Sequence, residues 1–366
     1  MTGFSNNDPG DVLLDLENTA SSTLKTSVAP LANEIDFNPK ILQQALMSLG
    51  EKGLLALRVP EKWGGYAASD RSFFNYQQLV ARYSGALAFL EVQHQSAASI
   101  IASSENLQLQ ELYLPKLSRG KKLLGVGFSQ IRRSGKPSVK AIPIAGGYQF
   151  KGFVPWVTGW GIFDEFILAG IMPGGRAIFA LVPFVKTVNP SSSIKFSEPM
   201  RLCGMSSTNT VTATVDNWFL PEERVVFIKP PGWIHENDKN NVLKATAFNI
   251  GCAEAGVDIL ETALKVKSLG FIREAIASFK AEIKNFCDAI WEAEENPDLE
   301  FNQKLELRAG AIDLAVRCAT AAVTVSSGAA NHISHPAQRI YREAMVYVVF
   351  RQTTTVMEAT LAKLKR

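Results

Sequence analysis

The chain has 366 residues, of which 46% are hydrophobic, and a formal net charge of +3, which suits two or three globular domains. Basic and acidic residues are interspersed, so the sequence lacks the concentrated basic stripe of a nucleic-acid-binding protein. The N-terminus lacks the basic stretch and apolar run of a signal peptide, and no apolar run approaches the roughly 20 residues that span a bilayer. We therefore expect a cytoplasmic protein without a membrane span.

The cysteines do not follow a metal-binding or disulfide pattern. Cys203, Cys252, Cys287 and Cys318 are scattered, without CxxC spacing. This pattern indicates unreactive thiols in a reducing compartment rather than a disulfide framework or a zinc site. We therefore expect no bound metal.

The first part of the chain, residues 1–120, is predicted to be a helical domain that follows a loose polar arm at residues 1–10. Apolar residues recur there at helical spacing. Pro39 after Asn38 fits the first turn of a helix, where the missing N–H donor of proline is not needed. Pro115 is expected to end or kink the last helix. The predicted helices are residues 11–31, 39–53, 73–104 and 107–120.

The middle part, residues 121–227, is predicted to be a small β domain, either a barrel or a sandwich. Its strand-like runs are rich in Val, Ile, Phe and Tyr, and short Gly and Pro breaks separate them. Gly146-Gly147 is predicted to be the turn between two of these strands. A further run, Asn209–Phe219, alternates as a strand does.

The last part, residues 228–366, is predicted to be helical after a proline-rich connector at residues 228–240. Four helical runs with short connections favour an up-and-down four-helix bundle. These runs are residues 242–270, 274–295, 305–330 and 336–366. The expected fold class is therefore a multi-domain α+β protein, with a β domain between two helical domains.

Several sequence words, in their order and at their intervals, resemble those of the acyl-CoA dehydrogenase family. They are GLLALRVPEKWGGY (53–66), LYLPKLSRGKKL (112–123), PWVTG (155–159), MRLCGMSSTNTVTATVDNWFLPEERVV (200–226) and QRIYREA (338–344). The resemblance covers nearly the whole chain. It implies a β barrel between two helical domains and FAD between the barrel and the C-terminal helices. It also implies a homodimer or homotetramer whose subunits share the FAD site.

The resemblance also suggests five FAD-binding residues. A flavin needs a flat apolar wall and hydrogen bonds at its N5 and O4 edge. By position, Trp156 would supply the wall. Thr158 would lie on the same strand face, because side chains alternate, and would offer its hydroxyl to N5. Phe128 and Ser129 would bind the pyrimidine edge of the ring, and Thr353 would contact FAD from the C-terminal segment.

The carboxylate that starts the family's chemistry is missing. The resemblance implies an acyl-CoA substrate, oxidation of a CH–CH bond, and a glutamate base that removes an α-proton from one of two positions. The family word YEGT reads FRQT here, so Arg351 occupies the glutamate position, and the second position is Asn241. A guanidinium stays protonated near neutral pH and cannot act as a base.

Two further family words differ. The loop at residues 129–138 reads SQIRRSGKPS, so its acidic residue is lost and Arg132 and Arg133 are present. The arginine that would hold the FAD diphosphate from the partner subunit has no clear match. Lys267 or Lys280 could supply positive charge there, although a lysine recognises a diphosphate less specifically than an arginine does.

Histidine is the remaining candidate base. His332 and His335 precede the last helix, and His94 lies on a helix expected to border the acyl pocket, although a single histidine on a helix is more often structural. Some proteins with this fold are monooxygenases, which need no α-proton base. We therefore weigh three hypotheses: an FAD-dependent oxidoreductase with altered or lost α-deprotonation, a flavin-dependent monooxygenase, and a catalytically degenerate binding protein.

Overall fold

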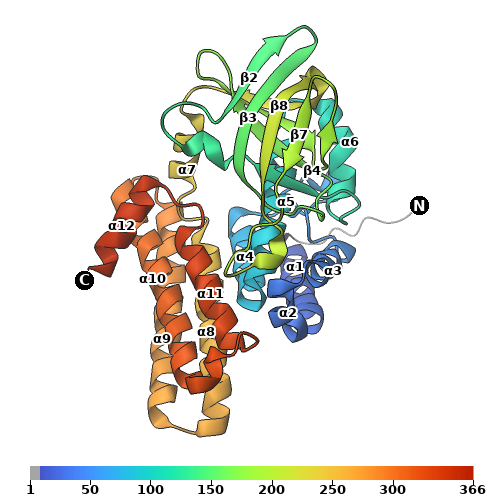
Figure 1. The fold of residues 1–366 in the computed structure, drawn as a ribbon. Helices are drawn as coiled ribbons and strands as arrows, with labels where there is room; N and C mark the ends of the chain where they lie inside the picture. Colours follow the sequence, from blue (N-terminus) through green and yellow to red (C-terminus); the bar gives the residue numbers. More distant parts are fainter. Residues whose placement is uncertain (1–8, 366) are drawn as a thin grey trace.

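The computed structural model describes residues 9–365. Figure 1 shows N-terminal helices (blue), a central sheet (green to yellow) and long C-terminal helices (orange to red). This arrangement confirms the expected fold class. Most of the predicted N-terminal arm lies outside the described residues, and Pro9 already begins a helix. The N-terminal helices are α1 (Pro9–Thr23), α2 (Ala32–Phe37), α3 (Pro39–Glu51), α4 (Asp70–Tyr83), α5 (Gly85–Ala102) and α6 (Leu107–Leu117).

Caps and breaks set the bounds of these helices. The side chain of Asn38 accepts a hydrogen bond from the backbone N–H of Lys40 at 3.0 Å, which confirms the predicted helix start. The single helix predicted at residues 73–104 is wrong, because Ser84 is extended (φ −158°, ψ 116°) and caps a second helix, α5. Pro115 lies inside α6, which ends two residues later.

The central domain is one nine-stranded sheet with the order β6-β7-β8-β3-β2-β4-β5-β9, and β1 pairs in parallel with β4. The predicted turn lies one residue earlier, at Ala145-Gly146, because Ile144 pairs with Gly147. The strands are β1 (Leu124–Gly127), β2 (Val139–Ile144), β3 (Gly147–Val157), β4 (Glu165–Ile171), β5 (Ala177–Pro183), β6 (Thr187–Val188), β7 (Ser193–Phe196), β8 (Val211–Pro221) and β9 (Val225–Lys229).

Both faces of the sheet are covered at its centre. Along β4, Phe166 and Leu168 belong to the main hydrophobic core, whereas Ile167 and Ala169 pack in a second cluster with apolar residues of α5 and α6. Successive side chains of a strand point to opposite faces, so a continuous apolar run is what a strand buried on both faces requires.

The C-terminal helices begin with one that the sequence did not predict. Helix α7 occupies part of the expected connector, and the predicted last helix is wrong because it is interrupted between Val349 and Thr354. The helices are α7 (Trp233–Asn240), α8 (Thr246–Lys267), α9 (Gly270–Glu295), α10 (Phe301–Ser326), α11 (Pro336–Val349) and α12 (Thr354–Leu364). Among the described residues, one stretch, Phe301–Asn331, is long and apolar enough to cross a membrane. Half of the most apolar part of this stretch is buried in the protein, as in the core helix of a bundle.

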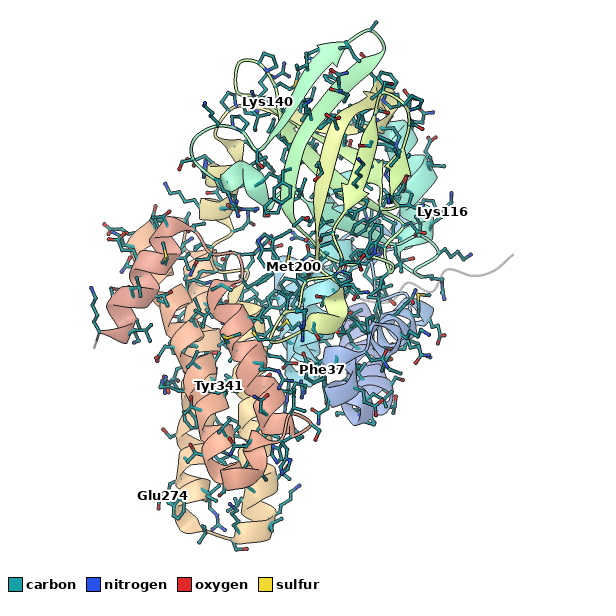
Figure 2. All side chains as sticks on the ribbon, viewed as in Figure 1. Phe37, Lys116, Lys140, Met200, Glu274 and Tyr341 are labelled. Carbon is teal, nitrogen blue, oxygen red and sulfur yellow. The ribbon has the colours of Figure 1, made fainter. Side chains whose placement is uncertain are left out.

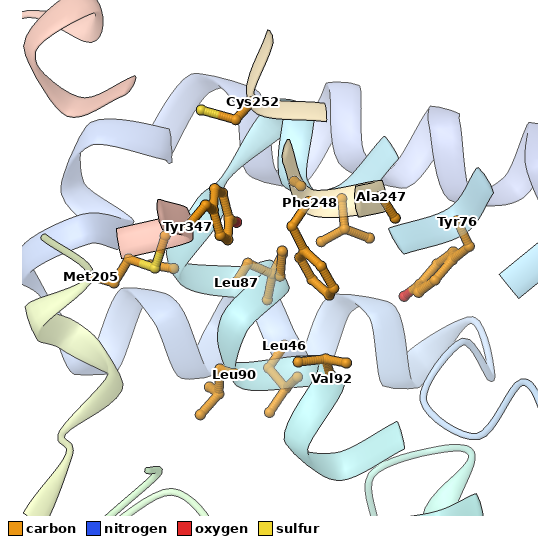
Figure 3. Close-up of a cluster of buried hydrophobic side chains, with 14 of the residues drawn as sticks. Leu46, Tyr76, Leu87, Leu90, Val92, Met205, Ala247, Phe248, Cys252 and Tyr347 are labelled. Atoms are coloured by element: carbon orange, nitrogen blue, oxygen red, sulfur yellow. The ribbon is translucent and has the colours of Figure 1, made fainter. Parts of the chain in front are cut away.

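Helix α11 is bound to the N-terminal domain by charged groups of the QRIYREA word. The carboxylate of Asp36, on α2, accepts a hydrogen bond from the backbone N–H of Met205 at 2.6 Å and pairs with Arg342. Glu343 accepts hydrogen bonds from the N–H of Gly85 at 2.9 Å and from Arg339 at 2.8 Å. Figure 3 shows the adjoining apolar core, in which Tyr347, Phe248, Leu87 and Val92 lie close together.

Candidate active site

A cavity of about 1620 Å³ lies between the three parts of the chain. Pockets for small molecules and cofactors usually measure about 300–1,000 Å³, so this cavity has room for a large cofactor and a substrate together. Its walls come from α4 and α5, from the sheet and the loop after β1, and from α7 to α12. All five predicted FAD-binding residues line it: Phe128, Ser129, Trp156, Thr158 and Thr353.

The end of β3 presents Trp156 to this cavity. The pairing of β3 with β8 is irregular between Val154 and Val157, and both valines are fully buried. The Trp156 side chain between them remains 46% exposed. An indole that is half exposed inside a cavity is an available flat apolar wall, whereas a tryptophan used only for packing would be covered.

The hydroxyl of Thr158 belongs to a short chain of threonines. Thr208 donates to the carbonyl oxygen of Met205 at 2.8 Å, so its bond with Thr210 (3.3 Å) uses the proton of Thr210. The bond of 3.1 Å between Thr210 and Thr158 then uses the proton of Thr158. The oxygen of Thr158 is thereby left as an acceptor for an N–H group in the cavity.

The third wall is the break between α11 and α12. Thr353 caps α12 by accepting a hydrogen bond from the N–H of Val356 at 3.3 Å. Phe350 is fixed by edge contacts with Phe89 and Phe248, and Arg308 donates to its carbonyl oxygen at 2.9 Å. The backbone around residue 351 is therefore held firmly against the N-terminal domain and α10.

Arg351 stands in the cavity at this break with a left-handed backbone (φ +51°). Within the described part of the chain it has neither a hydrogen bond nor an ion pair. Solvent reaches the side chain of Arg351. Desolvation by the surrounding protein is nevertheless the main cause that lowers the pKa of Arg351, and the charge of Arg132 is the second. The charge of Asp238 opposes this shift. Burial, and then Arg351, lowers the pKa of Arg308 to about 9. Both guanidinium groups remain charged near neutral pH.

No carboxylate occupies either family position of the base. Asn241 also lines the cavity, and its amide donates to the carbonyl oxygen of Asn237 at 2.6 Å. Asp238 is electrostatically coupled to Arg351, but both its oxygens are bound to Arg132, at 2.6 and 2.9 Å. Asp70, farther along the wall, pairs with Arg58 and Lys244.

The three histidines proposed as substitutes do not line the cavity. His94 is fully buried, and its ring nitrogens meet the carbonyl oxygen of Leu117 at 3.2 Å and the N–H of Leu124 at 3.0 Å. Burial lowers the pKa of His94 to about 4. His332 and His335 precede α11, whose 14 residues place them about 20 Å from Arg351 at 1.5 Å per residue. Proximity in sequence was misleading there.

The lysines considered for a diphosphate also lie elsewhere. Lys267 bonds to the carbonyl oxygen of Val325 and Lys280 pairs with Glu261, and neither lysine lines the cavity. Among the four cysteines, which are all free, Cys252 and Cys318 are buried, whereas Cys203 is exposed.

Sequence reasoning missed three groups that shape the site. Asp238 lies in the predicted connector at residues 228–240, and Arg308 lies in a predicted helix that contains other charged residues. Glu91 is fully buried on α5, beside residues that line the cavity, and burial raises the pKa of its carboxyl to about 8. The available signal was a single charge inside an apolar run, ALAFLEVQ, since glutamate is almost never fully buried without a partner.

Comparison with known proteins supplies an independent line of evidence. A family model described as acyl-CoA dehydrogenase, N-terminal domain, matches residues 13–121. An acyl-CoA dehydrogenase of Bacillus subtilis (strain 168) is 23% identical over 358 residues, which cover 93% of this chain and 94% of that protein. The oxygenase subunit HsaA of a flavin-dependent monooxygenase of Rhodococcus jostii (strain RHA1) is 21% identical over 211 residues, which cover 54% of this chain and 48% of that protein.

The fold of a solved glutaryl-coenzyme A dehydrogenase, in complex with glutaryl-CoA, is similar throughout. The TM-score is 0.78 at 19% sequence identity, and the match covers 100% of this chain and 97% of that chain.

Proposed function

Since this chain belongs to the acyl-CoA dehydrogenase family, we propose that it is a flavin-dependent oxidoreductase that binds FAD in the cavity. We infer an acyl thioester, or a related substrate, as the compound whose CH–CH bond is oxidised. The observation that carries the proposal is the half-exposed indole of Trp156, which faces the same cavity as Thr158 and Thr353. Thr353 is almost 200 residues away from the other two in the sequence, yet it lines the same cavity.

The residues present fit a flavin. The indole of Trp156 offers a flat surface, and the half-buried ring of Phe128 lines the same cavity. The acceptor oxygen of Thr158 suits an N–H group such as that of a reduced flavin, and its partner Thr210 fixes its orientation. A bound flavin would supply the acceptor for a hydride. The chain itself would position the ring and exclude water from it.

Removal of the α-proton, which accompanies hydride transfer in ordinary dehydrogenation, has no protein base in this proposal. Arg351 stays protonated and removes no proton, and Asn241 is an amide. Both oxygens of Asp238 are occupied by Arg132. We therefore propose that the α-proton passes to a water molecule and not to a protein carboxylate, since solvent reaches the side chain of Arg351, while the β-hydride would go to the bound flavin.

A flavin-dependent monooxygenase is the second candidate. The replaced base favours it, because such a reaction does not begin with α-deprotonation, and the relative from Rhodococcus jostii carries that description. The two candidates differ in a measurable way: the monooxygenase consumes oxygen in the presence of reduced flavin and substrate, whereas the dehydrogenase transfers electrons to an artificial acceptor without oxygen.

We also propose a homo-oligomer. Tyr341, Met345 and Val349 lie at four-residue spacing along α11 and are 45–59% exposed, Met345 and Val349 at the edge of the cavity. Figure 2 labels Tyr341 on α11. Met357 and Leu361 continue the apolar surface on α12. A monomer by light scattering at micromolar concentration would contradict this part of the proposal. A cytoplasmic location stays a prediction from the sequence.

Flavin binding tests the proposed function. Purified protein, reconstituted with FAD and desalted, is expected to retain flavin absorbance near 450 nm, as flavins in general do, and Trp156→Ala is expected to lose most of it. Phe153→Ala is a matched control, since Phe153 is on the same strand and 44% exposed, but outside the cavity. Absence of flavin from the wild-type protein would leave a degenerate binding protein as the better description.

A further inference from the structure

The cavity carries an excess of positive charge. Seven basic side chains and four acidic ones line it. Most of the basic groups have partners: Arg132 is paired with Asp238, Lys244 with Asp70, and Lys229 lies over the rings of Phe227 and Trp233. Arg351 has no partner among the described residues. Part of the excess positive charge of the cavity is therefore an unpaired guanidinium at the break between α11 and α12.

The backbone at Arg351 makes the choice of side chain informative. It follows the end of α11 with φ +51°, a left-handed conformation in which helices usually place glycine. A residue with a Cβ costs roughly 1 kcal/mol there. Arginine is thus not explained by the local backbone, and a role in the cavity is a better explanation for it.

The surroundings of Arg351 add to the charge instead of neutralising it. The charge of Arg132 lowers the pKa of Arg351, and the charge of Arg351 lowers the pKa of Arg308. The carboxylate of Asp238 raises the pKa of Arg351. Asp238 is already bound through both oxygens to Arg132. Arg351 and Arg132 therefore share one carboxylate, and Arg308, bonded to Asn249 and to the carbonyl oxygen of Phe350, adds a third positive charge. Clustered charges of one sign in a partly enclosed site are unfavourable unless a counter-ion joins them.

We propose that the cavity binds an anionic group, a carboxylate or a phosphate, with the guanidinium of Arg351 as its principal ligand and Arg132 adding to the field. A guanidinium recognises both anions through paired N–H groups. Thr354 and Thr355 line the same cavity, and their N–H groups open α12, which adds a favourable dipole. The inference deepens the proposed function, because the anion belongs to a molecule that occupies the same cavity.

Two molecules could carry this anion. One is the flavin nucleotide, whose phosphate would then be held by this chain itself, and the other is a substrate with a carboxylate or phosphate of its own. Both sources present the same kind of anion. If Arg351 binds the flavin, it should favour phosphorylated over unphosphorylated flavin. If it binds the substrate, it should favour an acidic over a neutral substrate.

The first experiment measures anion binding without flavin. Pyrophosphate and glutarate are titrated into the full chain by calorimetry at low ionic strength, with wild type, Arg351→Gln and Arg176→Gln compared. Arg176 is an exposed arginine outside the cavity, so its variant controls for loss of one charge. Arg351→Gln is expected to weaken binding of at least one anion by about 10- to 100-fold, and Arg176→Gln to leave it unchanged. Equal affinities in all three proteins would overturn the proposal.

A second variant separates loss of the ligand group from loss of the fold. Arg351→Gly suits the left-handed backbone and is expected to raise the melting temperature of the ligand-free protein, because it relieves both strain and charge repulsion. It is nevertheless expected to lose anion affinity as Arg351→Gln does. A glycine variant that is less stable than wild type would show that Arg351 stabilises the fold, and would contradict the proposal.

The source of the anion is found with matched ligands. If Arg351→Gln weakens FAD and FMN but not riboflavin, the anion is a flavin phosphate. If flavin affinities are unchanged and the variant loses a preference for succinyl-CoA over butyryl-CoA, the anion is a substrate carboxylate. A wild-type protein that binds pyrophosphate or glutarate but no flavin would refute the proposed function while supporting the anion site.

Discussion

The guanidinium of Arg132, on the loop after β1, binds both carboxylate oxygens of Asp238, on α7, at 2.6 and 2.9 Å. This bidentate pair joins the sheet to the C-terminal helices at the edge of the cavity. It also determines what the nearby residues can do. Asp238 is occupied and is not a free base, and Arg351 beside it has no carboxylate of its own.

Asp238→Asn should therefore destabilise the protein. The side chains of Arg132 and Asp238 are only 24% and 15% exposed, so the loss leaves a poorly solvated guanidinium near Arg351 and is expected to cost about 1–3 kcal/mol. Urea unfolding measures the change. Asp288→Asn is the control, because Asp288 and Lys284 are 55% and 75% exposed and such pairs contribute about 0–1 kcal/mol. Equal losses in the two variants would contradict the structural role of the Arg132–Asp238 pair.

The contact between α2 and α11 should be more sensitive. Asp36→Asn removes the partner of Arg342, whose side chain is 10% exposed, while the amide oxygen can still accept from Met205. An uncompensated buried cation costs about 3–5 kcal/mol, and the same unfolding experiment measures it. Asp216→Asn, which breaks an exposed pair with Lys151, should cost less than about 1 kcal/mol. A small loss in Asp36→Asn would mean that the helices hold together without this pair.

Glu91 should make stability depend on pH. Burial raises the pKa of its carboxyl from 4.5 to about 8, and the amides of Gln77 and Gln95 oppose the shift. The folded protein therefore prefers the protonated form. The free energy of unfolding is therefore highest, as far as Glu91 is concerned, below the pKa of this carboxyl in the unfolded chain. It falls as the pH rises towards about 8, by at most about 1.4 kcal/mol per pH unit.

The comparison of wild type with Glu91→Gln measures this dependence. The glutamine cannot ionise, so the unfolding free energy of wild type should fall relative to that of the variant between pH 5 and 8, a range chosen to span the titration. Parallel curves over that range would show that Glu91 is ionised in the folded protein.

Sequence patterns predicted the architecture because it depends on local chemistry, and the flavin wall stays a prediction from the family resemblance. Helical spacing, β-rich runs and the cap at Asn38 are visible in neighbouring residues. Trp156 lies near the end of β3, and Thr158 directly follows that strand. The break at residues 350–353 interrupts an apolar pattern without a proline or glycine. The break at Ser84 was missed although Gly85 follows it, because the apolar residues on both sides keep helical spacing.

The polar surroundings of the site could not be predicted for a different reason. Arg132 and Asp238 are 106 residues apart, and Arg308 and Phe350 are 42 apart; only the packing of domains brings them together. His332 and His335 show the opposite error, because residues close to Arg351 in sequence lie at the far end of α11.

Arg351→Glu tests whether the missing base is what separates this chain from ordinary dehydrogenation. The substitution places a carboxylate at the family position, beside Arg132 and Arg308. With FAD at saturating concentration, so that any loss of anion affinity at Arg351 does not limit the rate, it is expected to create or increase acyl-CoA dehydrogenation by about 10²- to 10⁴-fold, the usual contribution of a general base. Exchange of the substrate α-proton with deuterated water and bleaching of the flavin measure it. Arg351→Gln, which has no base, is the control. Wild type that matched Arg351→Glu would show that another group already removes the proton.

The proposed function depends on a flavin that lies against Trp156 in this cavity. Its most direct test is the affinity for FAD of wild type, Trp156→Ala and Phe153→Ala, measured by quenching of flavin fluorescence. Tight binding is expected for wild type and for Phe153→Ala, and a loss of about 10-fold or more for Trp156→Ala, since stacking on an aromatic side chain contributes roughly 1–3 kcal/mol. Equal FAD affinity in all three proteins, or none in wild type, would contradict it.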